Sequence, residues 1–252
     1  DLSKLVVKSQ PTKISPSLAQ AFVNSIEQSD QTNIPEGRVP LDHSIVVAWE
    51  AMMKATFAGA VGCDFLSLVH LSNKFTVLDE KPLDIFDNVT STAEIKAIRN
   101  LPAGRAVEVV ATITRDGLPA VEVISEFLFR GTYTDFSICF ERRKEQKMAV
   151  TIDRLADIAV LQSKPWVSFK QGFDCKSLLD QKLVFDLHTL GYFASATTYR
   201  SLQVSGQILI EDAETKVLRA AGDVTYQSMG SISNNPVVDY LNRCGAQINV
   251  LN

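Results

Sequence analysis

The first candidates for proton transfer are three histidines, because imidazole changes charge near neutral pH. His43 follows Asp42 at the start of an apolar stretch that favours a helix. A helix N-terminus lowers the pKa of a nearby histidine, so a neutral His43 could act as a general base. The alternative is that Asp42 caps the helix and His43 is a boundary residue with its ring on a polar edge. Adjacent helical side chains diverge, so the two residues form no catalytic pair by themselves.

The other two histidines lie in stretches with strand-like patterns. His70, within residues 68–73, is expected to be a hydrogen-bonded histidine of the core or of a sheet edge. His188 shares a strand face with Asp186, because alternate residues of a strand point the same way. We interpret that pair as a polar pair on the sheet surface and not as a catalytic site.

Glu50 is a candidate acid, because a carboxyl group buried in an apolar site has a raised pKa and can donate a proton. Lys54 stands four residues later, which favours a solvated ion pair instead. Around them, four apolar residues repeat at helical spacing: Val46, Trp49, Met53 and Phe57. Such a stripe has two interpretations, packing into a core and lining an acyl-chain tunnel.

Common catalytic and metal-binding motifs are absent from the sequence. It contains no GxSxG, P-loop, GxGxxG, HExxH or CxxC pattern. The four cysteines are scattered, without a histidine at metal-ligand spacing, at positions Cys63, Cys139, Cys175 and Cys244. We interpret them as buried thiols of a reducing compartment, and we expect a cytoplasmic protein without a metal site.

Composition narrows the class of protein further. The chain has 252 residues, 46% of them hydrophobic and 21% charged, which is enough for a sizeable core. A net charge of -4 is unfavourable for holding phosphates, so nucleic acid is not an expected partner. No apolar run reaches the roughly 18 to 20 residues that span a bilayer, so no membrane partner is expected.

The elements that must position these residues follow from the hydrophobic pattern. Residues 1–38 are polar and predict an arm or linker with a helix at 17–28. Residues 41–57 are apolar on nearly every side and predict a buried helix. Strands are expected at 66–78, 89–99, 105–115 and 121–129, with a hairpin turn at Asp116-Gly117. One buried helix followed by long antiparallel strands is an α+β unit whose sheet wraps around the helix.

A charged stretch at 141–145 precedes a second block of strands, predicted at 183–192, 196–210 and 217–226 with a turn at Glu211-Asp212. A final helix begins after Asn235 as N-cap, with Pro236 first and Gly245 as the stop. Its expected buried stripe is Val237, Leu241 and Cys244.

Five stretches, at residues 39–57 (VPLDHSIVVAWEAMMKATF), 68–73 (LVHLSN), 115–123 (RDGLPAVEV), 129–136 (FRGTYTDF) and 235–241 (NPVVDYL), carry a family resemblance. In order and spacing they resemble the dehydratase region of the fungal type I fatty acid synthase beta subunit. The resemblance implies two tandem hot-dog folds, each an antiparallel sheet around a long central helix. It places a first, non-catalytic hot-dog unit at 39–144 and a second hot-dog-like unit at 145–252.

In that family the region removes water from a (3R)-3-hydroxyacyl chain carried by acyl carrier protein. The family's catalytic Asp and His lie in a GDxNPxH motif, which we expect beyond the end of this chain. Asn235-Pro236 lacks the preceding Asp and the following His, and Gly222-Asp223 is not followed by x-Asn-Pro. No catalytic residue is therefore carried over.

The resemblance predicts a fragment of the dehydratase region, inactive alone, that shapes the acyl tunnel with the stripe of Val46, Trp49, Met53 and Phe57. The expected partners are acyl carrier protein, which presents the substrate on phosphopantetheine, and the other domains of the synthase; the chain itself needs no cofactor. Two alternatives remain: a purely structural scaffold, and a self-sufficient hydratase or thioesterase that uses His43 or Glu50. Neither the product of the parent synthase nor the oligomeric state follows from the sequence.

Overall fold

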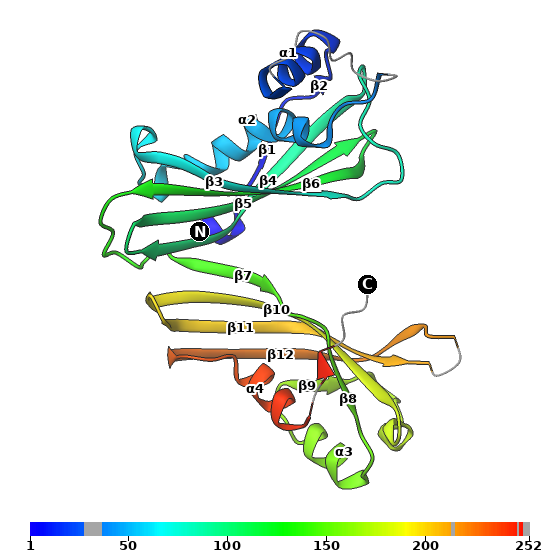
Figure 1. Cartoon of the computed structure of the whole chain (residues 1–252). Helices are drawn as coiled ribbons and strands as arrows, with labels where there is room; N and C mark the ends of the chain where they lie inside the picture. The colour runs from blue at the N-terminus through cyan, green and yellow to red at the C-terminus, as the bar shows by residue number, and fades with distance from the viewer. Residues whose placement is uncertain (28–36, 213–214, 246, 249–252) are drawn as a thin grey trace. The chain divides into compact units, whose positions relative to one another are not determined.

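The computed structural model describes residues 1–27, 37–212, 215–245 and 247–248, which belong to two units, Asp1–Ile138 and Cys139–Asn252 (Figure 1). The boundary falls before the predicted one after Lys144. The reason is that β7 (Phe140–Lys144) pairs with β10 (Lys182–Ser195) and so belongs to the second unit. Among the described helices, none combines the length and apolar character that a bilayer crossing requires.

The first unit is an antiparallel sheet with a helix packed on it, which is the expected hot-dog arrangement. Its elements are β1 (Val6–Lys8), β2 (Thr12–Lys13), α1 (Pro16–Glu27), α2 (Ser44–Thr56), β3 (Leu68–Val77), β4 (Asn88–Leu101), β5 (Gly104–Arg115) and β6 (Leu118–Arg130). Short 3-10 helices cover Leu2–Lys4, Leu41–His43, Gly59–Val61 and Phe65–Ser67. The sheet runs in the order β3-β6-β5-β4, and β1 and β2 pair with β4. Residues 1–27 therefore add strands to the sheet and do not form a free arm; the last residue of the predicted 17–28 helix lies outside the described residues.

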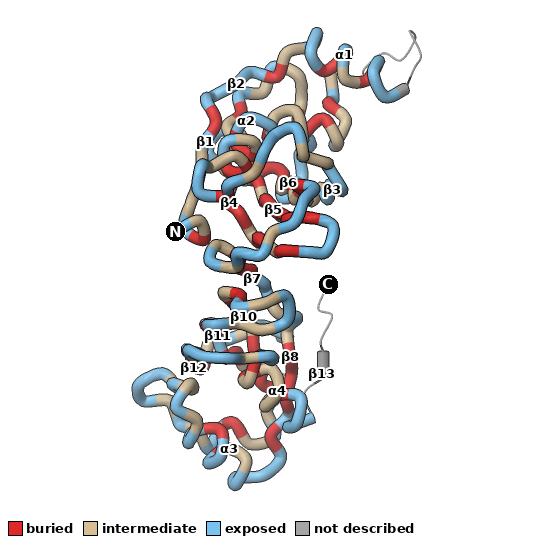
Figure 2. Tube along the Cα trace, turned by 90° about the vertical axis from the view of Figure 1, so that its left-hand side faces the viewer, coloured by how far each residue is buried: buried red, intermediate tan, exposed pale blue. Residues whose placement is uncertain are grey.

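The predicted strands and their inward faces are confirmed in this sheet. Asp116 and Gly117 both have positive φ, 51° and 83°, as a tight hairpin between β5 and β6 requires. Alternate residues of the two strands are buried: Val107, Val109, Ala111 and Ile113 on β5, and Val121, Val123, Phe127 and Phe129 on β6. Figure 2 shows buried segments along β4, β5 and β6, whereas β3 is mostly exposed.

Small side chains decide how α2 meets the sheet. Ala48, Ala51, Met52 and Ala55 are fully buried on the helix face that contacts β4 and β5. The bulky Trp49 lies at the edge of this face, against Phe127 of β6, and 42% of its surface is exposed, so the expectation of a helix buried all round is wrong. Hydrophobic residues on every side of a helix do not reveal which side meets the sheet. Here the side that meets it carries three alanines and one methionine.

The predicted N-cap of this helix is also wrong. A 3-10 turn at Leu41–His43 precedes α2, which begins at Ser44, and no side chain caps either segment. Asp42 therefore makes no capping hydrogen bond. Glu50 and Lys54 form the expected ion pair at 2.5 Å on the exposed side of α2.

The second unit has long antiparallel strands and two short helices. Its further elements are β8 (Met148–Thr151), α3 (Leu155–Gln162), β9 (Val167–Phe169), a 3-10 helix at Cys175–Leu178, β11 (Thr198–Glu211), β12 (Leu218–Ile232), α4 (Pro236–Arg243) and β13 (Gln247–Ile248). The strands follow the order β7-β10-β11-β12-β9, with β8 also on β10 and β13 on β8. The predicted turn at Glu211-Asp212 lies where β11 ends, before β12 begins at Leu218; residues 213–214 between them lie outside the described residues.

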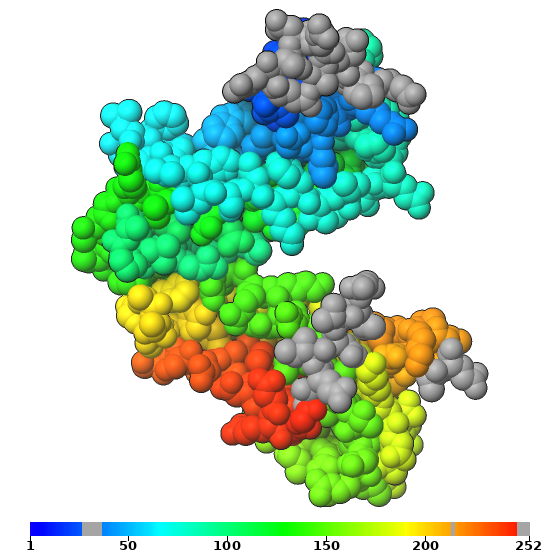
Figure 3. Space-filling view, in the orientation of Figure 1, coloured from blue at the N-terminus to red at the C-terminus, as the bar shows by residue number. Residues whose placement is uncertain are grey.

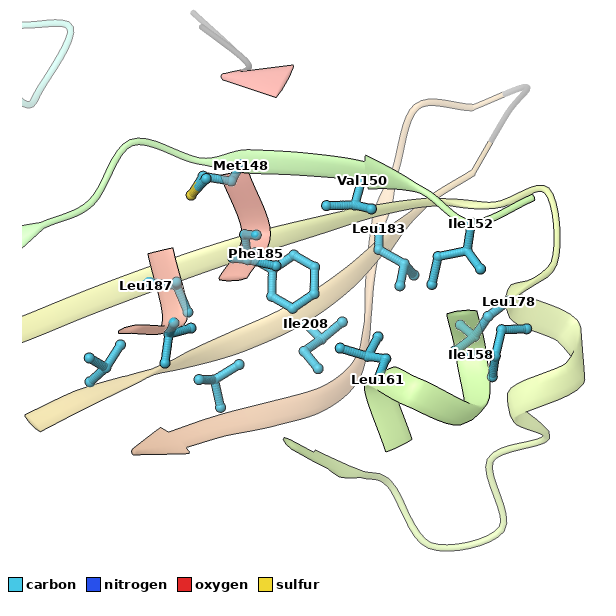
Figure 4. Packing of buried hydrophobic residues seen from close by; sticks show 14 of the residues in the cluster. Met148, Val150, Ile152, Ile158, Leu161, Leu178, Leu183, Phe185, Leu187 and Ile208 are labelled. Carbon is cyan, nitrogen blue, oxygen red and sulfur yellow. The ribbon is translucent and has the colours of Figure 1, made fainter. Parts of the chain in front are cut away.

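The core of the second unit lies between this sheet and the two helices (Figure 4). Leu183, Phe185 and Leu187 of β10 meet Ile158 and Leu161 of α3 in one buried cluster. The helices α3 and α4 have eight residues each, so the long α2 of the first unit has no counterpart among the described helices here.

The start of α4 is anchored through its cap. Asn235 Oδ1 accepts hydrogen bonds from the backbone N–H groups of Val237 and Val238, at 3.1 and 3.4 Å, as predicted. The amide Nδ2 of Asn235 donates to Thr189 Oγ1 at 3.0 Å, and Thr189 donates to Glu145 Oε1 at 2.6 Å. One side chain thus ties α4 to β10 and to the end of β7.

The end of α4 follows the prediction in part. Gly245 has a φ of 75°, the left-handed conformation expected of a helix stop. Val237 and Leu241 are buried, but Cys244 is exposed, so the predicted stripe is wrong at its last member.

The close approach of α2 to the sheet leads to a first prediction. Ala51→Leu inserts methylene groups where no space exists and should lower the free energy of unfolding by ~1–3 kcal/mol. Ala60→Leu, at an exposed position after α2, should change it by less than ~0.5 kcal/mol. Urea unfolding followed by Trp49 fluorescence in a Trp166→Phe background measures both. Equal stability of the two variants would contradict the tight contact.

The cap of α4 leads to a second prediction. Asn235→Ala removes both capping hydrogen bonds and the link to Thr189, and should cost ~1–2 kcal/mol of stability. Asn242→Ala, at an exposed position of the same helix, serves as the matched control and should cost much less. Trp166 fluorescence in a Trp49→Phe background reports on this unit during urea unfolding. A cost as small as that of the control would show that the cap does not hold α4.

Candidate functional site

His43 lies in the interior, and neither sequence interpretation describes it. Only 1% of its surface is exposed, and its ring packs edge-on against Phe22 of α1, with 5.3 Å between the ring centres. Neither ring nitrogen has a hydrogen-bond partner among the residues that the structure describes. Burial lowers the pKa of His43, and nearby Asp42 only partly opposes this. The ring is neither on a polar edge nor open to a substrate.

Glu50 has the ion pair and not the raised pKa that a proton donor needs. The hydrogen bond from Lys54 lowers the pKa of Glu50, and the carboxylate is exposed. At neutral pH this carboxylate is ionised and faces solvent.

His70 lies on the edge strand β3 beside a β-bulge. In the pairing with β6, His70 is opposite Phe127 while Ser72 is opposite Glu126, so Leu71 is an extra residue. A bulge shifts the alternation of side chains by one position. His70 and Asn73, which regular alternation would place on opposite faces, therefore meet on the same face.

This face holds a small polar network. His70 Nε2 contacts Ser72 O at 3.2 Å and Asn73 Oδ1 at 2.9 Å. Because a carbonyl oxygen only accepts, Nε2 is the donor in both contacts, and an imidazole with its single proton there can accept a hydrogen bond at Nδ1. The buried Ser125 donates to the same Asn73 oxygen at 2.5 Å. The prediction of a hydrogen-bonded edge histidine agrees with this geometry.

A surface depression of about 450 Å³ opens above this network. It is lined by Ile45, Val46 and Trp49 of α2 and by His70 and Asn73 of β3. These two elements lie side by side on the face of the first unit that Figure 3 shows. One wall is therefore apolar, and the other presents the imidazole and the amide.

Phe127 of β6 lies beneath the depression and contacts one residue from each of its two walls. Its buried ring stacks with His70, with 5.0 Å between centres, and meets the edge of Trp49 at 6.3 Å. This residue, Asn73 and Ser125 were not recognised as site residues from the sequence. The inward alternation of β6 indicates that Phe127 and Ser125 are buried, but no pattern in the sequence predicts the bulge on β3 that places Asn73 beside His70.

The tunnel candidates divide into two groups in the structure. Val46 and Trp49 line the depression, whereas Met53 and Phe57 do not. Phe57, after the end of α2, packs against Phe65 and Phe129 instead.

A buried arginine fixes the loop that follows α2. The Arg105 guanidinium donates to Asn100 Oδ1 and Val61 O, both at 2.9 Å, and to Asp135 O at 3.1 Å. It also stacks on the ring of Tyr133, 4.4 Å from its centre. Burial raises the pKa of the neighbouring Cys63 thiol, which disfavours the reactive thiolate. The cluster is structural.

The remaining candidates lie apart from the depression. His188 is exposed on β10, and its predicted partner Asp186 pairs with Lys144 and Lys147, at 3.7 and 3.5 Å. All four cysteines are free thiols, but only Cys139 is buried, so their interpretation as buried is wrong for Cys244 and holds in part for the other two. No cluster of potential metal ligands occurs in the described part of the chain.

Comparison with known proteins shows that the chain is similar to beta subunits of fatty acid synthase. Residues 140–241 match the family described as "Fatty acid synthase subunit beta, insertion domain". The chain is 40% identical to the fatty acid synthase subunit beta of Saccharomyces cerevisiae over 83% of its length, and 37% identical to that of Schizosaccharomyces pombe over 89%. It spans only 10% and 11% of these two relatives.

Solved structures give a weaker likeness. HtdX of Mycobacterium tuberculosis aligns with 88% of this chain and 100% of its own, with a TM-score of 0.41 and 15% identity. The truncated HadBC (3R)-hydroxyacyl-ACP dehydratase complex of the same organism aligns with 51% of this chain and 97% of its own, with a TM-score of 0.41 and 12% identity. The architecture therefore rests on the strands and helices of this chain alone.

The buried His43 leads to a third prediction. Its pKa is lowered in the folded chain, so below about pH 6.5 the unfolded chain takes up a proton that the folded chain resists. The free energy of unfolding should therefore fall as the pH drops below this value, with a slope of at most ~1.4 kcal/mol per pH unit from this group. His43→Phe should lose that component.

Urea unfolding at pH 7.5 and 5.5, followed by Trp49 in the Trp166→Phe background, measures the effect. His188→Gln, at the exposed histidine, is the matched control and should keep the pH dependence. If the pH dependence of unfolding were unchanged in His43→Phe, it would not arise from His43.

Proposed function

Because the chain belongs to the fungal fatty acid synthase beta subunit family, of which it spans about a tenth, we propose that it is part of the (3R)-3-hydroxyacyl-ACP dehydratase region. In this proposal the first unit shapes an acyl-chain tunnel and supports a catalytic hot-dog unit elsewhere in the parent subunit. Acyl carrier protein would present the substrate on its phosphopantetheine arm, and other domains of the synthase would surround the chain.

One observation carries the tunnel proposal: the part of α2 that borders the polar network on β3 presents the apolar residues Val46 and Trp49. Val46 and Trp49 offer apolar surface to an aliphatic chain, and their burial against it would be favourable. Across the depression, His70 Nδ1 can accept a hydrogen bond and the Asn73 amide can donate one. Such a pair suits the hydroxyl and carbonyl groups of a 3-hydroxyacyl thioester.

The same geometry supports the proposal that the chain alone is inactive. Dehydration needs one group to remove the C2 proton and another to protonate the departing hydroxyl. His70 is the only titratable residue among those that line the depression. The alternative of a self-sufficient enzyme needs His43 or Glu50, but the first is buried away from solvent and the second is held in an ion pair.

Binding of an acyl thioester tests the tunnel. The chain has two tryptophans, so Trp166→Phe leaves Trp49 as the only reporter. Titration with decanoyl-pantetheine should change Trp49 emission in a saturable way. Val46→Glu places a charge where the chain would lie and should weaken binding roughly tenfold or more, because the burial of one valine side chain is lost.

Leu66→Glu is the matched control, because Leu66 is 83% exposed and lies outside the depression. It should bind the thioester like the unsubstituted chain. Absence of saturable binding, or equal binding by the two glutamate variants, would contradict the tunnel and favour the purely structural scaffold. Hydration of crotonyl-pantetheine by the same sample would contradict the proposed inactivity.

A further inference from the structure

A second cavity, of about 400 Å³, lies wholly within the second unit. It opens between β8, the start of α3, β10 and the end of α4. Its apolar lining includes Val150, Ile152, Leu161, Leu183, Phe185 and Leu241. Figure 4 shows the first five of these side chains directed toward one another from β8, β10 and α3. The volume is within the roughly 300–1,000 Å³ of small-molecule sites.

Charged groups line this cavity as well, and they balance. Arg154 donates two hydrogen bonds to Asp157, at 2.8 and 2.9 Å, and lies 3.9 Å from Asp153. Arg243, at the end of α4, supplies the second positive charge. Two guanidinium groups thus stand with two carboxylates, so neither an anion nor a cation finds a net opposite charge.

Uncharged polar groups complete the lining at the end of α4. Burial and the neighbouring Cys244 thiol raise the pKa of Tyr240 to about 12, so its hydroxyl stays protonated at neutral pH. Trp166 packs edge-on against the Tyr240 ring, with 5.5 Å between centres, and Lys164 Nζ lies 4.6 Å from the ring centre. The Tyr240 ring is therefore held in place beside the cavity.

We propose that this cavity binds a medium-length aliphatic group whose polar end is uncharged, such as an amide, ester or thioester. The aliphatic part would contact the apolar lining and lose its own exposure to water, which is favourable in proportion to the area that it buries. The polar end can accept a hydrogen bond from Tyr240 or Arg243 without meeting a net charge. For a free carboxylate, the attraction of Arg243 would be offset by the repulsion of Asp153 and Asp157. The site shares no residue with the depression on α2, so it stands or falls independently of the proposed tunnel.

Trp166 provides the test, because it contacts Tyr240 and Trp49→Phe leaves it as the only tryptophan. The probe is N-methyldecanamide, compared with decanoate and with N-methylacetamide, which lacks the chain. We expect a saturable change in Trp166 emission with N-methyldecanamide, at least about tenfold weaker binding of decanoate, and none of N-methylacetamide. Bound N-methyldecanamide should also slow alkylation of the exposed Cys244 by iodoacetamide.

A pair of matched variants locates the binding. Val160 lines the cavity and is 46% exposed, so Val160→Glu should weaken binding about tenfold without affecting the fold. Val217→Glu makes the same change at a 54% exposed valine outside the cavity and should bind normally. The proposal is overturned if N-methyldecanamide leaves Trp166 emission unchanged, if Val160→Glu binds as well as Val217→Glu, or if decanoate binds more tightly.

Discussion

The contact between α2 and the sheet is the constraint on which the first unit depends. Ala48, Ala51 and Ala55 are fully buried on that face together with Met52, which brings the helix close to the strands. Trp49, the bulkiest residue of the helix, is instead 42% exposed. An apolar helix face open to solvent costs hydration free energy in an isolated chain, and surfaces of this kind mark interaction or ligand sites. The candidate site is therefore a direct consequence of how the core is packed.

The sequence predicts this architecture well where local chemistry decides. Strands β4, β5 and β6 follow from the alternation of apolar and polar residues, the hairpin from Asp116-Gly117, and α4 from Asn235-Pro236, because each of these patterns favours one local structure. The exposure of Trp49 did not follow, since an all-apolar helix gives no signal for orientation. The pairing of His70 with Asn73 did not follow either, because a bulge depends on the register of β3 against β6.

The second unit shows the same division between local and long-range information. The cap at Asn235 is predicted from adjacent residues. Its link to Thr189 and Glu145 could not be predicted in this way, because it joins three segments that are distant in the chain. The cavity near Tyr240 is likewise assembled from β8, α3, β10 and α4, whose residues are far apart in the chain. Hydrophobic periodicity identifies which of these residues are buried. It does not say where the packing leaves a space.

Three of the candidates for proton transfer are limited by their surroundings. Among the residues that the structure describes, His43 is enclosed beside Phe22 without a polar partner, Glu50 is stabilised as a carboxylate by Lys54, and no carboxylic acid lines the depression beside His70. A group that cannot exchange protons with a substrate contributes to a reaction only by shape, contact and orientation. The apolar wall formed by Val46 and Trp49 supplies contact without chemistry. The geometry of this chain therefore supports the proposed binding and positioning role, in which the proton-transfer groups would come from another part of the parent subunit.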